Sequence, residues 1–303
     1  MKNTTEVPAF PHIRSKETTA TMLWDVVIAL APAAIFGVYR FGQSALIVLA
    51  LAVATCMVLD FVCNKLRKKS YKGYEPSAIV TGLILGMSLY PEVPYWVPVA
   101  GGAVAALLVK MLFGGLGRNI LNPAVTALVV IFGGLRQFIQ PSAVQATEDI
   151  GLLDTFLGFR EGTIGGVSTF LLLLGGLYLV FCKVISLRIP FFYLLTFTAF
   201  AAMFSVITKN EIPNVQESVT FFCRDGLLLG AFFMATDTTT SPVTGKGQIV
   251  YGILLGILTG VCSVVTKGGH EVLYGILAGN LLVRLIDRLT YPRYFGKGQK
   301  AKL

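Results

Sequence analysis

The sequence predicts an all-α, polytopic membrane protein of about ten transmembrane helices. Hydrophobic residues make up 54% of the 303 residues and charged residues only 14%, with a mean hydropathy of +0.72, whereas soluble domains carry about 25% charged residues. The apolar residues recur in blocks of about 15 to 23, the length at which a helix crosses the hydrocarbon core. They do not show the ten-residue alternation that is typical of an outer-membrane barrel.

Ten such blocks follow one another along the chain, and their edges predict the spans. They cover residues 21–40, 43–62, 77–90, 95–113, 121–138, 164–182, 190–207, 219–236, 248–265 and 271–287. The polar first twenty residues lack the short apolar core and small-residue cleavage site of a signal peptide. We therefore expect the first span to direct membrane insertion.

The basic residues predict the orientation of these spans. Five segments that fall on one side hold most of the Lys and Arg: "NKLRKKSYKGYE", "FGGLGRN", "KVISLR", "DTTTSPVTGKGQ" and the tail "RYFGKGQKAKL". Because loops rich in Lys and Arg stay in the cytoplasm, we expect both termini there, in a plasma (inner) membrane. The net charge of +9 is explained by these loops, and no nucleic-acid partner is predicted.

The two halves of the chain share a pattern around paired glycines. "TGLILGMSLYPEVP" places Gly82 and Gly86 as "DGLLLGAFFMATDTTTSP" places Gly226 and Gly230, and in both the apolar run is cut short. Five spans per half would invert the second copy, so we expect repeats at 1–138 and 164–303. Short, Gly-interrupted spans in inverted halves predict broken helices around a ligand site, although glycines also serve helix packing alone.

The segment between the repeats, 139–163, is expected outside the cytoplasm. Its stretch "QPSAVQATEDIGLLDTF", residues 140–156, carries three acids and no base, and no regular helix is predicted in it. Thr147 is either part of a solvated loop or the cap of a short helix that begins at "TEDI". The five cysteines, scattered without C-x-x-C spacing, predict neither a metal site nor an iron–sulfur cluster.

Five stretches together resemble one family: "EPSAIVTGLILGMSLYP", "LFGGLGRNILNPA", "ISLRIPFFYL", "GAFFMATDTTTSPVTGKGQIVYG" and "LAGNLLVRLIDRLTYPRYFG". Over residues 11–296 the chain resembles the RnfD and NqrB family, membrane proteins of the Rnf complex and of the sodium-pumping NADH:quinone reductase. This resemblance implies an ion-pumping electron-transfer complex, with the shorter chain favouring the Rnf branch. Ferredoxin and NAD⁺ would then bind partner subunits, which include a flavoprotein and iron–sulfur proteins.

The resemblance also implies two flavins, an FMN esterified through its phosphate to a threonine and a riboflavin in the membrane. The family's attachment pattern, D-x-x-[S/T]-G-A-T, falls on "PSAVQAT" and makes Thr147 the expected attachment residue. The A-T ending is kept, while Pro141, Val144 and Gln145 differ from the pattern. An attachment threonine must be reached by a second enzyme, which suits an exposed loop.

Further candidates follow from the matched motifs. Asn119 and Asn122 in "GGLGRNILNPA" can offer donors and acceptors to the pyrimidine edge of a flavin, and Asn122 can equally be a helix cap. "MATDTTTSP" offers Thr236, Asp237 and Thr240 to an uncharged flavin or a cation on the same side, and Asp237 can equally be an interfacial residue. Arg224, a fixed cation, is the candidate for a flavin phosphate or an ion.

No catalytic residue is predicted, because the substrates are expected on partner subunits. No metal ligand is predicted, because His12 and His270 lie far apart in the sequence and show no ligand spacing. The coupling ion, Na⁺ or H⁺, is left open. The alternative to a flavin-carrying subunit is a secondary transporter or channel without a redox cofactor, since a five-plus-five inverted repeat with broken helices is also a transporter plan.

Overall fold

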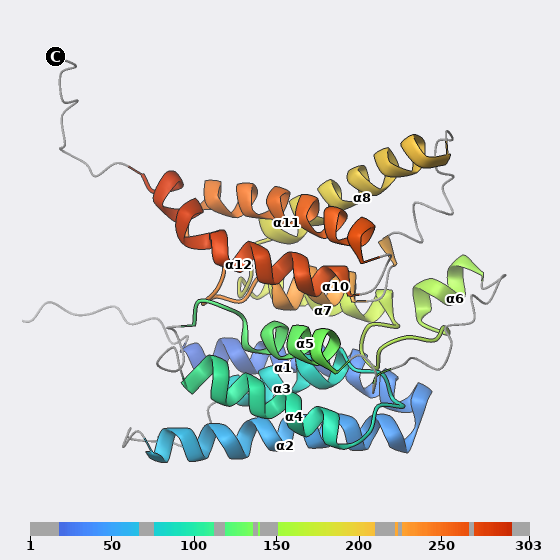
Figure 1. Ribbon diagram of the computed structural model, residues 1–303, viewed down its shortest axis with the longest axis vertical. Coiled ribbons are helices and arrows are strands. Elements are labelled where there is room, and N and C mark those ends of the chain that lie inside the picture. The colour runs from blue at the N-terminus through green and yellow to red at the C-terminus, as the bar shows by residue number, and fades with distance from the viewer. Residues whose placement is uncertain are drawn as a thin grey trace, which may run out of the picture.

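The computed structural model describes residues 18–66, 76–111, 119–135, 139, 151–209, 222–223, 226–266 and 270–292. Within these ranges all regular secondary structure is helical (Figure 1). The predicted all-α membrane fold is therefore confirmed. Two predicted site residues, Thr147 and Arg224, lie outside the described residues.

The helices of the first half follow the predicted spans closely. They are α1 (Thr19–Phe41), α2 (Gln43–Leu66), α3 (Pro76–Met87), α4 (Trp96–Ala103), which continues as the π-helix η1 (Val104–Met111), and α5 (Pro123–Gly134). α3 and α5 have 12 residues each, about 18 Å of helix against about 30 Å of hydrocarbon. α3 is thus the half-span expected at the first glycine pair, whereas the shortness of α5 was not predicted.

The segment between the halves contains a short helix, α6 (Leu152–Leu157), that was not predicted. The second half contains α7 (Thr169–Phe181), α8 (Arg188–Lys209), α10 (Leu227–Leu229), which runs on as the π-helix η3 (Gly230–Met234), α11 (Gly245–Val265) and α12 (Glu271–Thr290). Four helices in the described part are long and apolar enough to cross a membrane by themselves, α1, α2, α8 and α11. α10 and η3 together form the second broken helix.

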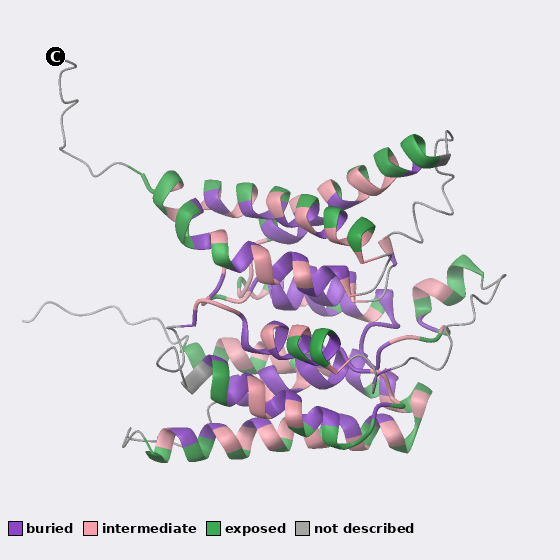
Figure 2. Cartoon of the chain, in the orientation of Figure 1, coloured by how far each residue is buried: buried purple, intermediate pink, exposed green. Residues whose placement is uncertain are grey.

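The helices lie side by side, with the first half in one part of the bundle and the second half in the other (Figure 1). In the first half α2 packs against α3 and α4, and in the second half α8 packs against α11, which also packs against α12. The contacts of α1 with α7 and of α5 with α12 join the halves. The broken helices occupy the centre, and the outer helices expose apolar faces (Figure 2), as lipid-facing helices do.

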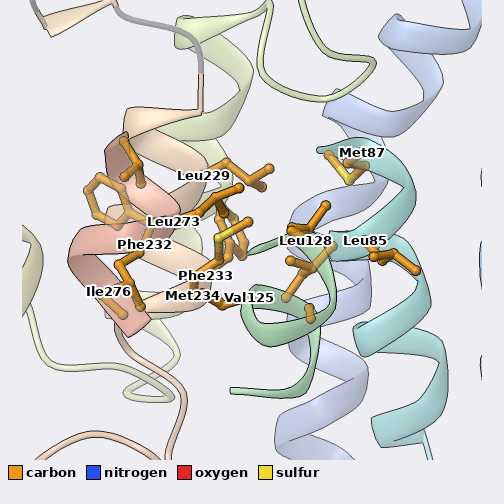
Figure 3. Packing of buried hydrophobic residues seen from close by; sticks show 14 of the residues in the cluster. Leu85, Met87, Val125, Leu128, Leu229, Phe232, Phe233, Met234, Leu273 and Ile276 are labelled. Carbon is orange, nitrogen blue, oxygen red and sulfur yellow. The ribbon is translucent and has the colours of Figure 1, made fainter. Parts of the chain in front are cut away.

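The centre of the bundle is closely packed where the halves meet. Leu128 of α5 lies between Leu85 of the first half and Leu229 and Phe233 of the second (Figure 3). Glycines bring α7 close to its neighbours: a Cβ on Gly175 would meet the Ala29 carbonyl of α1. Small residues at such crossings let helix backbones approach, which is the main source of helix association in lipid.

The paired glycines of the sequence repeat have different roles in the two halves. A Cβ on Gly82 would lie 2.6 Å from the Val53 Cα of α2, so α3 needs this glycine for close packing. Gly226 instead has φ +76° and begins α10 in a left-handed conformation that glycine adopts freely. The pattern therefore located both broken helices, but not a shared function of the glycines.

The expectation of no regular helix within 140–156 was wrong for its last residues. α6 covers Leu152–Leu157, with Asp154 in its first turn and Gly158 at φ +106° as its left-handed C-cap. An acid near a helix N-terminus and a glycine just past its end are favourable signals in so short a helix. The rest of the stretch, including Thr147, lies outside the described residues.

Candidate functional site

A cavity of about 310 Å³ lies between the two halves, at one end of the broken helices. The first turns of α1, α3 and α5 line it from the first half, and the segment after α7 and the turn after η3 line it from the second. Its volume is within the range of about 300–1,000 Å³ usual for small-molecule sites. Four residues singled out from the sequence line this one cavity: Asn119, Asn122, Thr236 and Asp237.

Asn122 is held by backbone groups of both halves. Its Oδ1 accepts hydrogen bonds from the amides of Ala124 (3.0 Å) and Val125 (3.3 Å), which makes it the N-cap of α5. Its Nδ2 donates to the Met234 carbonyl at the end of η3, 3.2 Å away. The alternative interpretation of Asn122 as a cap is thus confirmed, and the residue also ties one broken helix to the other.

Asn119 differs from Asn122 because its acceptor is unused. Its side chain is 7% exposed, and its Oδ1 is buried without a hydrogen-bond partner. A buried amide oxygen without a donor costs roughly 1–3 kcal/mol. Since Asn119 lines the cavity, a ligand that presents an N–H or O–H to this oxygen would recover that cost.

The turn after η3 supplies the only charged group among the described residues that line the cavity, Asp237. Its Oδ2 accepts hydrogen bonds from the hydroxyls of Thr239 (2.9 Å) and Thr240 (3.2 Å). Thr236, which is buried, donates to the Phe232 carbonyl one turn earlier. Thr240 therefore acts on the cavity through Asp237, while Thr236 and Asp237 border it directly.

The remaining walls are mostly apolar and were not predicted from the sequence. Phe232 and Phe233 of η3 line the cavity together with residues of α1 and α3, which include Met22, Leu23, Val26, Val80 and Ile84. Ser77 and Thr81 add polar groups near the start of α3. The signal that could have found Ser77 and Thr81 is their place near the start of a broken helix, where side chains of the two halves of the chain meet.

The chemistry of the cavity suits a flat, largely uncharged molecule with a polar edge. Aromatic and aliphatic side chains can cover its faces, and Asn119, Thr81 and Asp237 offer polar groups at the rim. A phosphate has no described cation here to bind, because the lining residues in the described part include neither Lys nor Arg. Within that part, no group of three or more His, Cys, Asp or Glu could hold a metal ion.

Comparison with known proteins places the chain. The model of the NQR2, RnfD, RnfE family matches residues 6–296. The D subunit of the Na⁺-translocating ferredoxin:NAD⁺ oxidoreductase complex of Acetobacterium woodii is 36% identical over 311 residues, covering 96% of this chain and 95% of that protein. The D subunit of the proton-translocating complex of Clostridium ljungdahlii is also 36% identical, over 330 residues and 97% of each chain.

A third relative extends the match at slightly lower identity. The D subunit of the ion-translocating oxidoreductase complex of Methanosarcina acetivorans is 33% identical over 289 residues, which cover 94% of this chain and 95% of that protein. The matches extend over nearly the whole length on both sides, as the resemblance of the separate motifs led us to expect. The chain therefore belongs to the NQR2, RnfD, RnfE family.

Proposed function

We propose that this protein is the flavin-carrying RnfD subunit of a membrane-bound, ion-translocating ferredoxin:NAD⁺ oxidoreductase complex. The functions of its relatives support the assignment, since they are subunits of such complexes and match nearly the full length. Ferredoxin and NAD⁺ would bind the partner subunits, a flavoprotein and iron–sulfur proteins among them. The complex would lie in the cell membrane, with both termini of this chain in the cytoplasm.

The cavity between the halves is proposed to hold a neutral flavin, riboflavin. The observation that carries this proposal is the unpartnered Oδ1 of Asn119, because the pyrimidine edge of an isoalloxazine ring carries an N–H that this oxygen can accept. Phe232 and Phe233 would cover the ring. The absence of Lys and Arg from the described lining residues favours riboflavin over FMN, whose phosphate would face the carboxylate of Asp237.

When bound, the flavin supplies one- and two-electron redox chemistry that amino-acid side chains do not. The protein supplies orientation and exclusion of water. Asn122 fixes the distance between α5 and η3 through its bonds to both, so the rim of the cavity keeps its shape. The carboxylate of Asp237, held by two threonine hydroxyls, places negative charge beside the polar edge and would disfavour added negative charge there.

A second flavin, FMN, is proposed on Thr147 through a phosphoester. The supporting observations are the A-T ending of the attachment pattern and the position of the following helix, since α6 lies at the end of the bundle opposite to the one where α12 ends (Figure 1). Arg224 is the proposed partner of the phosphate. With a flavin at each end, the subunit would let electrons pass between partner proteins on the two sides and couple this to Na⁺ or H⁺ movement.

The two flavins can be separated by one experiment on the purified complex. Acid precipitation releases non-covalent riboflavin, which chromatography quantifies, while phosphoester-bound FMN stays on the polypeptide and fluoresces in a denaturing gel. We expect Thr147→Ala to lose the gel band and keep riboflavin. We expect Asn119→Leu to lose most of the riboflavin and keep the band.

Thr126→Ala is the matched control, because its hydroxyl donates to the Asn122 carbonyl at the start of α5 and it does not line the cavity. It should retain both flavins. A wild-type complex that carries no flavin in either fraction would refute the redox assignment and favour the transporter or channel alternative.

A further inference from the structure

The interface of α8, α11 and α12 contains a row of polar side chains that bond from helix to helix. The hydroxyls of Tyr193 and Thr259 lie 2.7 Å apart and both residues are fully buried. The Tyr251 hydroxyl donates to Asn280 Oδ1 over 2.8 Å, with Asn280 1% exposed. Three of these residues, Tyr193, Tyr251 and Thr259, lie on α8 and α11, which are long and apolar enough to cross a membrane. Buried polar groups inside such helices are functional candidates by default.

The polar row extends along one face of α11. Thr244, Gln248, Tyr251 and Thr259 are spaced by four, three and eight residues, and these spacings keep them on the same side of a helix. Thr244 contacts the Thr290 hydroxyl of α12 at 2.6 Å. At the opposite end Glu271, the first residue of α12, is only 4% exposed.

The row therefore spans the bundle. α12 begins at the end of the bundle where α6 lies and ends at the other (Figure 1). Glu271 and Thr290 are its first and last residues, and Asn280 lies near its middle. Polar groups of these three helices are thus distributed along the full depth of the membrane and not gathered at one interface.

The three helices that carry the row also contain buried polar atoms without a hydrogen-bond partner. The described part of the chain has four buried side-chain nitrogen or oxygen atoms without a hydrogen-bond partner, and three lie on these helices: Ser205 Oγ on α8, Gln248 Oε1 on α11 and Asn280 Nδ2 on α12. Each leaves a buried donor or acceptor that a water molecule would satisfy. If the row served only to bind the helices together, its members would be expected to satisfy one another.

The close packing of these helices limits what can move along the row. A Cβ on Gly275 would meet the Thr259 hydroxyl, and one on Gly256 would lie 2.9 Å from the Tyr193 carbonyl oxygen. A metal cation needs several oxygen ligands around it, and the backbones leave little room for such a shell. A proton needs only neighbouring hydroxyls, a carboxyl group and single waters, which exchange hydrogen bonds in place.

We propose that the polar row from Glu271 through Thr259 and Tyr193 to Asn280, Tyr251 and Thr290 conducts protons across the membrane. One proton enters at one end and one leaves at the other, so the row itself is neither oxidised nor reduced and keeps its composition. The energy to drive net transfer comes from the electron transfer of the proposed function, and in that respect the proposal rests on it.

The test uses the whole complex in sealed membrane vesicles supplied with reduced ferredoxin and NAD⁺. Proton uptake is followed with a pH-sensitive dye, ²²Na⁺ uptake with the isotope, and NADH formation by absorbance. We expect the near-isosteric Thr259→Val and, separately, Glu271→Gln to lower the initial rate of proton uptake at least about tenfold, because each breaks a proton-transfer step. Thr259→Ser keeps the hydroxyl and should retain most of the uptake.

Thr198→Val on α8 is the matched control, since its hydroxyl donates to the Leu194 carbonyl of its own helix. It should take up protons like the wild type. Tyr193→Phe, which keeps the ring and removes the hydroxyl, gives a second measure if Thr259→Val does not assemble. Flavin content and complex yield, measured on every variant, separate a blocked path from a damaged fold.

Proton uptake at the wild-type rate in Thr259→Val or Tyr193→Phe would overturn the proposal, as would a wild-type complex that transports ²²Na⁺ and no protons. An equal loss in Thr259→Ser and Thr259→Val would also overturn it, because the hydroxyl would then be irrelevant. A complex without flavin and without NADH formation contradicts the proposed function instead, so the two failures are distinguishable.

Discussion

The two halves of the molecule pack alike but use their buried hydroxyl groups differently. In the first half the Thr81 hydroxyl bonds the Ser77 carbonyl and that of Ser88 bonds the Ile84 carbonyl, each at 2.7 Å. In the second half, buried Tyr, Thr and Asn side chains bond from helix to helix. The hydroxyls along α3 are therefore satisfied locally, whereas those of α8, α11 and α12 also hold the helices to one another.

This difference matches the two proposed tasks. Helices whose hydroxyls are satisfied locally can present their polar ends to a ligand, as α3 and α5 do at the cavity. Helices that bond one another at several levels, as α8, α11 and α12 do, can hold a row of polar groups.

The largest expected effect is on the apolar packing of the first half. In Gly82→Val the added Cβ would lie 2.6 Å from Val53 Cα, which is backbone and cannot rotate away. We expect the free energy of unfolding to fall by about 3 kcal/mol, measured by thermal unfolding in detergent. Gly134→Ala is the control, since nothing lies within 4 Å of its Cβ position. Equal melting temperatures in the two variants would contradict the packing role of Gly82.

The next effect concerns bonds between helices. Tyr251→Phe removes the partner of Asn280 Oδ1 and leaves a buried amide without any described side-chain partner, which should cost about 1–3 kcal/mol. Thr81→Val in the first half removes a bond to a carbonyl of its own helix and should cost less than about 0.5 kcal/mol. If both variants unfold at the same temperature, the contrast between the halves is wrong.

The two asparagines that line the cavity are expected to differ in role, Asn122 in the stability of the fold and Asn119 in flavin binding. Asn122→Ala removes the N-cap of α5 and the bond to Met234, so we expect a loss of about 1–2 kcal/mol together with weaker flavin retention. Asn119→Ala removes an unpartnered acceptor, so the flavin-free protein should be as stable as the wild type or slightly more stable. Its bound riboflavin, measured after acid release, should be largely lost. A destabilised flavin-free Asn119→Ala protein would show that Asn119 serves the fold instead.

Much of this architecture could be predicted from the sequence because hydrocarbon thickness constrains it. A span must be apolar over a fixed length, so α1, α2, α11 and α12 begin or end within three residues of the expected positions. Part of the cavity could be predicted. Asn119 and Asn122 of the first half and Thr236 and Asp237 of the second were expected on the same side of the membrane, and all four line the cavity. The apolar wall that α1 contributes, with Met22 and Val26, could not be predicted from the sequence. In an apolar helix, the sequence does not distinguish a side chain that faces a ligand from one that faces lipid.

The polar row on α8, α11 and α12 escaped prediction for a related reason. Tyr193 lies 66 residues before Thr259, and Thr259 lies 21 residues before Asn280, with no motif among the three. Their proximity depends on how three helices cross, which depends in turn on glycines such as Gly256 and Gly275. Single hydroxyls in apolar spans are common, and only the packing brings them together.

The smallest expected effect is at the joint between the halves, far from the cavity. The ring of Phe132, in the last turn of α5, stacks on His270 just before α12, with centroids 3.6 Å apart and planes at 15°. Phe132→Leu keeps an apolar side chain and loses the ring contact, which should cost about 1 kcal/mol. Val130→Ala, on a lipid-facing side of the same helix, is the control. The cavity borders the first turn of α5, and neither Val130 nor Phe132 lines it. The flavin content should therefore not change in either variant. A loss of riboflavin in Phe132→Leu would mean that the two ends of α5 are coupled and that the halves move as one body around the ligand.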